Sequence, residues 1–316
     1  MDRKILVIGT GALGTVFGGL LQKSGCNVSY MGKGDHFEVI KKNGIKINGI
    51  WGEHFISPIK AFNSPDQIED IYDIVLLCVK SKDTKETADI AGKFLKNDGI
   101  CVSLQNGLNN VEQISLAVGP ERTVGGRVIF GVVINTPGIA TVSVYADQVL
   151  LGAPFGKVSE HNLIGLQLSL IEAGIPTDLT DNILGFIWSK VLYNSALNPL
   201  SAILNVTYGE LGENTYTVRI MKDIIREIYS IAGAKNIEML IPDSEDYIQF
   251  FFDKLLPPTK NHHSSMLQDI RAGRITEIDS LNNAIVSFGK ELTIPTHVNE
   301  TIVGIIKVIE QKNNCV

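Results

Sequence analysis

A strand-like run followed at once by three spaced glycines is the feature that most limits the fold of this chain. Residues 5–8 are apolar, and the turn Gly9-Thr10-Gly11-Ala12-Leu13-Gly14 follows them. In a G-x-G-x-x-G turn the first glycine permits tight bending, the second admits a pyrophosphate, and the third lets a helix pack on the strand. Helix N-termini also attract phosphate. The pattern predicts a dinucleotide site, although a glycine-rich turn without a ligand has the same spacing.

The first half of the chain alternates apolar runs with helical patterns, which predicts a doubly wound parallel sheet. The predicted strands are Lys4–Ile8, Asn27–Met31, Asp73–Val79, Ile100–Leu104 and Pro176–Leu179. The predicted helices are Leu13–Lys23, Phe37–Lys42, Thr84–Leu95, Val111–Val118 and Glu160–Ala173. Asp98-Gly99 is expected to form a turn, Ile45–Phe62 a hairpin-like excursion, and Thr123–Gly152 further strands, some of them antiparallel.

Helical periodicity dominates from about Asp181 onward. The predicted helices are Ile183–Asn198, Thr215–Ala234, Ser244–Phe252, Ser264–Ala272, Thr276–Leu292 and Pro295–Gln311. At 316 residues, two domains are expected. The fold class is therefore α/β, with an N-terminal Rossmann-type domain (residues 1–180) and an all-helical substrate and catalytic domain (residues 181–316). The second substrate is expected in the cleft between them.

Composition excludes several classes of protein. The net charge is −6, which gives no indication of a nucleic-acid surface. No apolar run is long enough to span a bilayer, and we expect no presequence, because the glycine turn lies close to Met1. The four cysteines lack zinc or C-x-x-C spacing, and His262-His263 has no partners at metal-ligand spacing. We expect a cytoplasmic protein without a metal. A homodimer is one open alternative for the oligomeric state.

A row of polar residues marks the first helix of the second half. Lys190, Asn194 and Asn198 fall at positions i, i+4 and i+8 of an otherwise apolar segment. On an α-helix this spacing makes one stripe, which would be costly to bury without partners. Pro199 is expected to kink or end the helix just past Asn198. The stripe lines either a cleft or a solvated edge.

A second polar cluster runs from Asn261 to Asp279. Asn261 or Ser264 can cap a short helix that stops at Gly273. Thr276 with Asp279 three residues later resembles a weak capping box for the next helix. These residues can serve as caps alone, so the local pattern leaves capping and binding roles open.

Together these motifs resemble ketopantoate reductase, also called 2-dehydropantoate 2-reductase. The resemblance rests on the glycine turn, Gln105-Asn106-Gly107, the Lys190-Asn194-Asn198 row, and Ser264-Ser265-Met266-x-x-Asp269 leading to Thr276-Glu277-Ile278-Asp279. The motifs occur in order along essentially the whole chain, and the two C-terminal ones are far more specific than the glycine turn.

The resemblance implies reduction of 2-dehydropantoate to (R)-pantoate with NADPH, on the route to pantothenate and coenzyme A. Lys190 would donate the proton to the carbonyl oxygen, and Glu277 would orient the network of cofactor, substrate and lysine. The substrate would be held by Asn106, Asn194, Asn198 and Ser265. The cofactor would be held by Gly9, Thr10, Gly11, Ala12, Leu13, Gly14, Lys33, Lys80, Asn106 and Glu277. A positioned ammonium suits this chemistry, because hydride addition to a ketone builds negative charge on oxygen.

The end of the second predicted strand favours NADPH over NADH. NAD enzymes usually carry Asp or Glu there to hold the ribose 2′-hydroxyl. Here Val28–Gly34 has no acid, and Lys33 can meet a 2′-phosphate. Many relatives carry arginine at this position, and lysine lacks its bidentate fork. An ordinary loop lysine is the alternative.

The sequence leaves two other functions open. One is a related reductase or dehydrogenase acting on a different 2-oxo or 2-hydroxy acid, because fold alone does not determine the substrate. The other is a nucleotide-binding regulator without turnover. Ser265 and Glu277 are separated by a helix of roughly 12 Å, so we expect Ser265 at the carboxylate end of the substrate and Glu277 nearer the nicotinamide.

Overall fold

The computed structural model describes residues 3–156 and 158–313, which form two compact units. The first contains residues up to Asn106 and then Asn110–Ile183. The second contains the short segment Gly107–Asn109 and the chain from Leu184 onward.

The first unit is built on a sheet of eight strands among the described residues, in the order β12-β11-β8-β7-β6-β1-β2-β5. These strands are β1 (Lys4–Ile8), β2 (Asn27–Met31), β5 (Lys60–Phe62), β6 (Tyr72–Leu77), β7 (Leu95–Ser103), β8 (Thr123–Arg127), β11 (Val149–Gly152) and β12 (Thr177–Leu179). Pairing is parallel except between β11 and β8. Register runs from Ile5↔Val28 on one side of β1 to Ile5↔Ile74 on the other.

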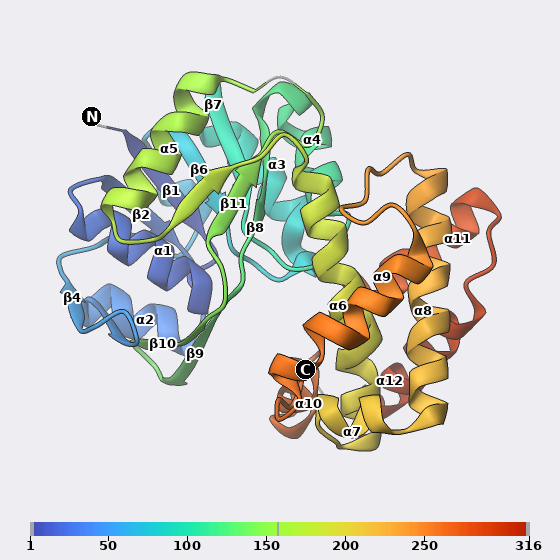
Figure 1. Ribbon diagram of the computed structural model, residues 1–316. Coiled ribbons are helices and arrows are strands. Elements are labelled where there is room, and N and C mark those ends of the chain that lie inside the picture. The colour runs from blue at the N-terminus through green and yellow to red at the C-terminus, as the bar shows by residue number, and fades with distance from the viewer. Residues whose placement is uncertain (1–2, 157, 314–316) are drawn as a thin grey trace. The chain divides into compact units, whose positions relative to one another are not determined.

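Consecutive apolar residues in the central strands, 5–8 in β1 and 74–77 in β6, point to both faces of this sheet, and both faces are buried. In β1, Ile5 and Val7 join one core cluster, while Leu6 and Ile8 join another. One face is covered by α1 (Ala12–Lys23) and α5 (Glu160–Glu172), and the other by α3 (Thr84–Phe94) and α4 (Asn110–Val118), as Figure 1 shows. Short 3-10 turns lie at 65–67, 81–83 and 120–122.

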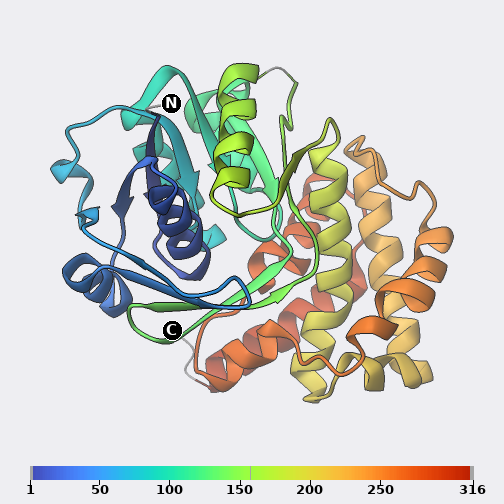
Figure 2. The ribbon, with the colours of Figure 1, turned by 60° about the vertical axis from the view of Figure 1, so that its left-hand side comes forward.

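A second sheet in this unit has the order β4-β3-β10-β9. Its strands are β3 (Ile45–Gly49), β4 (His54–Ile56), β9 (Phe130–Thr136) and β10 (Ile139–Tyr145). The hairpin-like excursion is confirmed over residues 45–56 by the antiparallel β3–β4 pair, but the last part of the predicted segment is β5, which belongs to the first sheet. Strand β10 pairs with β3 across about ninety residues of chain, which no local pattern predicts. The sheet packs on α1 beside α2 (Asp35–Asn43) (Figure 2).

The second unit is helical. Its α-helices are α6 (Ile183–Leu204), α7 (Tyr208–Glu213), α8 (Thr215–Ala234), α9 (Ser244–Phe250), α10 (Ser265–Arg271), α11 (Asn282–Leu292) and α12 (His297–Lys312). Shorter turns span 251–255, 257–259 and 278–280. The core gathers apolar side chains from these helices, including Trp188 and Leu192 of α6 and Ile224 and Ile228 of α8. Within the described chain, no helix combines the length and the apolar character needed to cross a bilayer.

The predicted fold class is confirmed, and several details are corrected. Asp98-Gly99 is not a turn, because both residues lie inside β7, where the pairing with β6 shifts register. Helix α7 was not predicted. The segment expected as one helix over Thr276–Leu292 is divided into a 3-10 turn and α11.

Candidate active site

Each glycine of the turn after β1 meets a different steric demand. Gly9 has a φ of 95°, and a Cβ there would lie 2.7 Å from Val79. A Cβ on Gly14 would lie 2.1 Å from the carbonyl oxygen of Gly9, so α1 packs directly on the turn. A Cβ on Gly11 would meet nothing within 4 Å, which leaves open space beside this backbone. These are the three environments that a dinucleotide-binding turn requires.

The N-terminus of α1 suits an anion. Gly11 is its N-cap residue, and within the described chain its first turn has neither a side-chain cap nor an acidic residue. An α-helix leaves its first N–H groups without intrahelical partners, and its N-terminus carries partial positive charge. The backbone of Ala12 and Leu13 can therefore donate to a pyrophosphate, and the turn fits the cofactor that the sequence implies.

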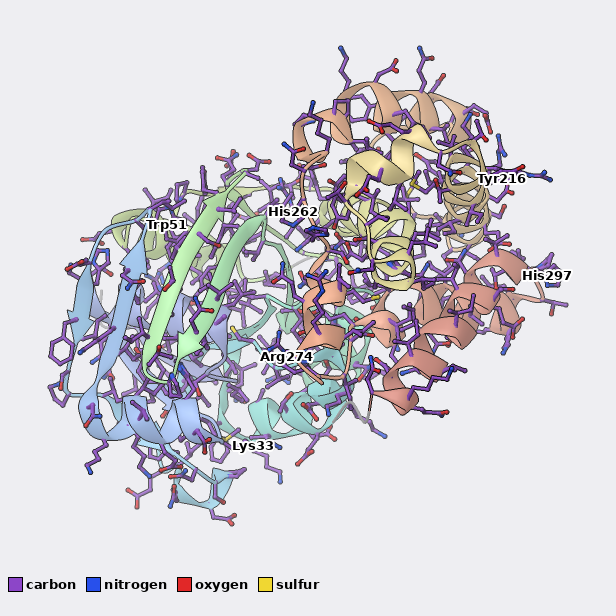
Figure 3. All side chains as sticks on the ribbon, turned by 90° about the horizontal axis from the view of Figure 1, so that it is seen from below. Lys33, Trp51, Tyr216, His262, Arg274 and His297 are labelled. Carbon is purple, nitrogen blue, oxygen red and sulfur yellow. The ribbon has the colours of Figure 1, made fainter. Side chains whose placement is uncertain are left out.

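The tip of β2 lies beside the glycine turn. The backbone N–H of Gly9 donates to the carbonyl of Met31, 2.9 Å away. A Cβ on Gly32 would lie 2.1 Å from the Thr10 hydroxyl, so only glycine fits there. Lys33 follows and is exposed at the surface of this unit (Figure 3). Its predicted contact with a 2′-phosphate stays a prediction.

Side-chain hydrogen bonds join the loops after β6 and β7. The amide of Gln105 donates to the Val79 carbonyl at 3.0 Å. The carbonyl of Asn106 accepts from the Ser81 hydroxyl and from the Asn110 amide, both at 2.9 Å. Lys80, the residue between Val79 and Ser81, is exposed. The backbones that carry Lys80 and Asn106 are thus held together.

The carboxyl ends of β2, β1, β6 and β7 share one edge of the sheet, because these neighbouring strands are parallel. This edge is where doubly wound sheets bind ligands. The structure brings the predicted residues of the first unit to it: the turn Gly9–Gly14, Lys33, Lys80 and Asn106.

In the second unit, α6 carries Lys190, Asn194 and Asn198 on one continuous helix. Lys190 and Asn194 are half-buried, and Asn198 is 3% exposed. The alternative of a solvated edge does not describe Asn198, which is almost wholly enclosed by protein. The expected end just past Asn198 is wrong, because α6 contains Pro199 and continues to Leu204.

A buried asparagine explains how α6 accommodates its proline. Proline lacks an N–H, so the carbonyl of Ser195 loses its usual partner four residues later. The side-chain amide of Asn282 donates to that carbonyl at 3.2 Å and to Oδ1 of Asn299 at 2.9 Å. Asn299 in turn donates to Glu227 at 2.7 Å. A chain of buried polar groups therefore links α6 to α11, α12 and α8.

Tyr208 holds the side chain of Asn198. The phenol hydroxyl donates to Oδ1 of Asn198 at 2.6 Å, and both residues are buried. Burial raises the pKa of Tyr208, so the hydroxyl remains a donor across the physiological range. Oδ1 of Asn198 is occupied by this bond, and the amide nitrogen is the group left to act as a donor.

Two adjacent serines at the start of α10 have different surroundings. Ser264 is buried; its hydroxyl accepts from the N–H of Leu267 at 3.0 Å and donates to the Asn198 carbonyl at 3.1 Å. Ser264 is therefore the cap that the sequence indicated. Ser265 is exposed in the first turn of the same helix, which leaves its hydroxyl accessible near the Asn198 end of α6.

The segment before Glu277 is held by α12. Glu310 is 7% exposed, and its Oε1 accepts from the backbone N–H and the hydroxyl of Thr276 at 2.8 and 2.7 Å. Lys307 bridges Glu310 at 3.1 Å and Asp279 at 2.6 Å. The weak capping box is wrong, because Thr276 accepts from Ile278 instead and Asp279 pairs with Lys307.

Sequence reasoning missed Tyr208, Asn282 and Glu310. The sequence hinted only at a donor such as Asn282, because a proline inside a helix leaves a carbonyl that some donor must satisfy. The donors themselves lie far along the chain. Among the described residues no group of three or more His, Cys, Asp or Glu side chains is arranged to hold a metal ion.

Comparisons with known proteins agree with the motifs. Residues 5–154 match the family Ketopantoate reductase PanE/ApbA, and residues 182–310 match Ketopantoate reductase PanE/ApbA C terminal. The chain is 36% identical to a 2-dehydropantoate 2-reductase of Aquifex aeolicus over 99% of both chains. It is 33% identical to one of Pyrococcus horikoshii over 97% of both chains.

Solved structures show the same likeness. A PanE/ApbA family ketopantoate reductase from Ralstonia eutropha has a TM-score of 0.85 and 27% identity, covering 98% of this chain and 99% of the other. D-mandelate dehydrogenase with NADH and anilino(oxo)acetate has a TM-score of 0.83 and 26% identity over the same shares. The resemblance inferred from the motifs is confirmed, and the chain belongs to the ketopantoate reductase family.

Proposed function

We propose that this protein reduces 2-dehydropantoate to (R)-pantoate with NADPH. The main support for the proposal is α6, which continues past Pro199 without a break. It presents Lys190, Asn194 and Asn198 in one row. A cation and two neutral amides at this spacing suit a small 2-oxo acid, because amides bind carboxylate without adding charge.

The bound cofactor supplies the hydride, and the protein supplies binding and orientation. The glycine turn holds the pyrophosphate through the first N–H groups of α1. Lys33 meets the 2′-phosphate, and Lys80 and Asn106 lie beside the nicotinamide. The shared strand edge and the open space beside Gly11 support these roles.

Lys190 is the proposed proton donor. When the carbonyl carbon gains a hydride, negative charge grows on its oxygen, and a positioned ammonium stabilises that charge. Lys190 then gives one proton to the oxygen. One hydride and one proton convert the ketone to a secondary alcohol, and the lysine regains its proton from solvent.

The remaining residues hold the substrate. Asn194, Asn198 and Ser265 bind its carboxylate and hydroxyl, and Glu277 orients Lys190 and the cofactor.

A substrate panel tests the proposal. Loss of NADPH absorbance is followed with 2-dehydropantoate, pyruvate, 2-oxoisovalerate and phenylglyoxylate, each with NADPH and NADH. The proposal expects the highest kcat/KM with 2-dehydropantoate and NADPH. Equal or faster turnover of another 2-oxo acid contradicts the substrate assignment.

A reductase for a different 2-oxo acid is the second candidate. The likeness to D-mandelate dehydrogenase favours it, because that enzyme is also related over nearly its full length. A regulator without turnover is the third, and it predicts NADPH binding without oxidation for every acid in the panel. A cytoplasmic location stays a prediction, and a homodimer stays an open alternative.

A further inference from the structure

Both ring nitrogens of His36 are engaged in hydrogen bonds. This half-buried residue is the second of α2. The backbone N–H of Gly138 donates to its Nδ1 at 3.0 Å, and its Nε2 lies 3.0 Å from the Thr15 hydroxyl. A backbone amide only donates, so Nδ1 must accept and the neutral ring carries its proton on Nε2. Nε2 therefore donates to the Thr15 hydroxyl. That hydroxyl in turn donates to the Thr10 carbonyl at 3.3 Å.

These bonds join three segments of the first unit. Thr15 directly follows Gly14 of the glycine turn, and α2 begins directly after Lys33-Gly34. Gly138 lies in the turn between β9 and β10 of the second sheet. A Cβ on Gly138 would lie 2.6 Å from Val39 of α2, so this turn packs closely on the helix.

We propose that His36 is a positioning residue for the dinucleotide, holding the Lys33 loop against the glycine turn in its neutral form. This inference rests on the cofactor assignment of the proposed function. The two segments already meet through the bond from Gly9 to the Met31 carbonyl. His36 adds a second connection at the C-terminal end of the Lys33 loop.

Protonation of the His36 ring removes its hydrogen bond with Gly138. A cationic ring carries a proton on Nδ1, which then opposes the N–H of Gly138. Burial lowers the pKa of His36 below 6.5, in accord with a ring held neutral. Cofactor affinity should therefore be highest above the pKa of His36, which burial lowers below 6.5, and should decline as the pH falls through that pKa.

The charged and titratable groups on the surrounding elements include the exposed Lys46 of β3, whose backbone N–H donates to the Gly138 carbonyl at 3.1 Å. Lys33 precedes α2, and Asp35 and Glu38 lie in its first turn. Lys23 is at the far end of α1, and Tyr145 is at the far end of β10. The second half of α2 adds a lysine pair at 41–42. Burial is the cause of the lowered pKa of His36.

The test measures the Kd of NADPH and of NADH by fluorescence between pH 5 and 8. NADH is included because the 2′-phosphate of NADPH itself titrates near pH 6. The variants are His36→Ala, which loses both bonds, and His36→Asn, whose Oδ1 can replace Nδ1 as the acceptor. His297→Asn is the matched control, since His297 is exposed on α12 of the other unit (Figure 3).

Wild type and the control should lose roughly threefold to tenfold in affinity for either cofactor between pH 7.5 and 5, beyond the decline seen in the His36 variants. His36→Ala should bind weakly and His36→Asn nearly normally at pH 7.5. Parallel pH profiles in all four proteins overturn the role of His36 and leave the cofactor assignment intact. Absence of binding by either cofactor overturns both.

A measurement on wild type removes the dependence on variants that fold. The His36 ring is titrated by NMR with and without NADH. Its pKa should fall on binding, because the bound state favours the neutral ring. An unchanged pKa contradicts the proposal.

Discussion

The side-chain amide of Asn282 donates to the backbone carbonyl of Ser195, the one that Pro199 leaves without its helical partner. This bond joins the start of α11 to the middle of the helix that carries the proposed catalytic row. Since Ser195 lies between Asn194 and Asn198, the bond supports the part of α6 that presents both amides.

Asn282→Ala should lower the free energy of unfolding by about 1–3 kcal/mol, because it leaves the buried Ser195 carbonyl and the Asn299 side chain without a donor. The measurement is urea denaturation. Asn283→Ala is the matched control, because Asn283 is the next residue but only bonds Asp279 at the surface.

Pro199→Ala sharpens this test, because alanine restores an N–H that can reach Ser195. In the Pro199→Ala background, Asn282→Ala should cost clearly less than in wild type. Equal costs in the two backgrounds would mean that the bond to Ser195 contributes nothing measurable.

Tyr208→Phe should raise the KM for the 2-oxo acid several-fold, roughly 2- to 10-fold for one lost hydrogen bond. The reason is that Asn198 loses the donor that orients its amide. Affinity for NADPH should not change. Tyr193→Phe is the control, because its hydroxyl bonds Thr259 instead of the row on α6. Equal effects of the two substitutions on KM would contradict a role for Tyr208 in orienting Asn198.

Much of the fold follows from local patterns in the sequence. The sequence shows the glycine turn, the apolar central strands and the spacing of the row on α6, because each of these depends on residues that are neighbours in the chain. Gly14 is a clear case, since the spacing of the turn alone requires a residue without Cβ against Gly9.

What the sequence could not predict depends on distant partners. A proline usually ends a helix, and α6 continues because Asn282 supplies a donor from 87 residues beyond Ser195. The predicted helix over 276–292 is interrupted at Leu281, whose φ of −104° and ψ of −105° are not helical, between the 3-10 turn and α11. The second sheet likewise depends on β3 and β10, which are remote in sequence.

Glu310→Ala should lower kcat by roughly tenfold, because Thr276, the neighbour of Glu277, loses two charge-assisted hydrogen bonds. The affinity for NADPH should change less. Glu310→Gln keeps an acceptor and should recover most of the activity. Burial alone would lower the pKa of Lys307, but its bonds to Asp279 and Glu310 outweigh burial and raise that pKa, so Lys307 should stay charged between pH 6 and 9. A pH-dependent loss in that range in wild type alone would contradict this account.

Lys33→Ala should weaken NADPH by roughly 10-fold and NADH hardly at all, since only NADPH offers a phosphate for the ammonium. The exposed acids Asp35 and Glu38 begin the next helix and would then oppose the 2′-phosphate unscreened. Kd values for both cofactors measure this preference. Lys42→Ala, on the exposed end of the same helix, is the control, and an unchanged cofactor ratio in Lys33→Ala would refute its role.

The central claim is that Lys190 donates the proton to the substrate carbonyl. The most direct measurement compares kcat for 2-dehydropantoate and Kd for NADPH in wild type and Lys190→Ala. In Lys190→Ala, kcat should fall roughly 10²- to 10⁴-fold while the Kd for NADPH stays within about twofold. A kcat near that of wild type, or a loss of NADPH affinity as large as the loss of kcat, would contradict it.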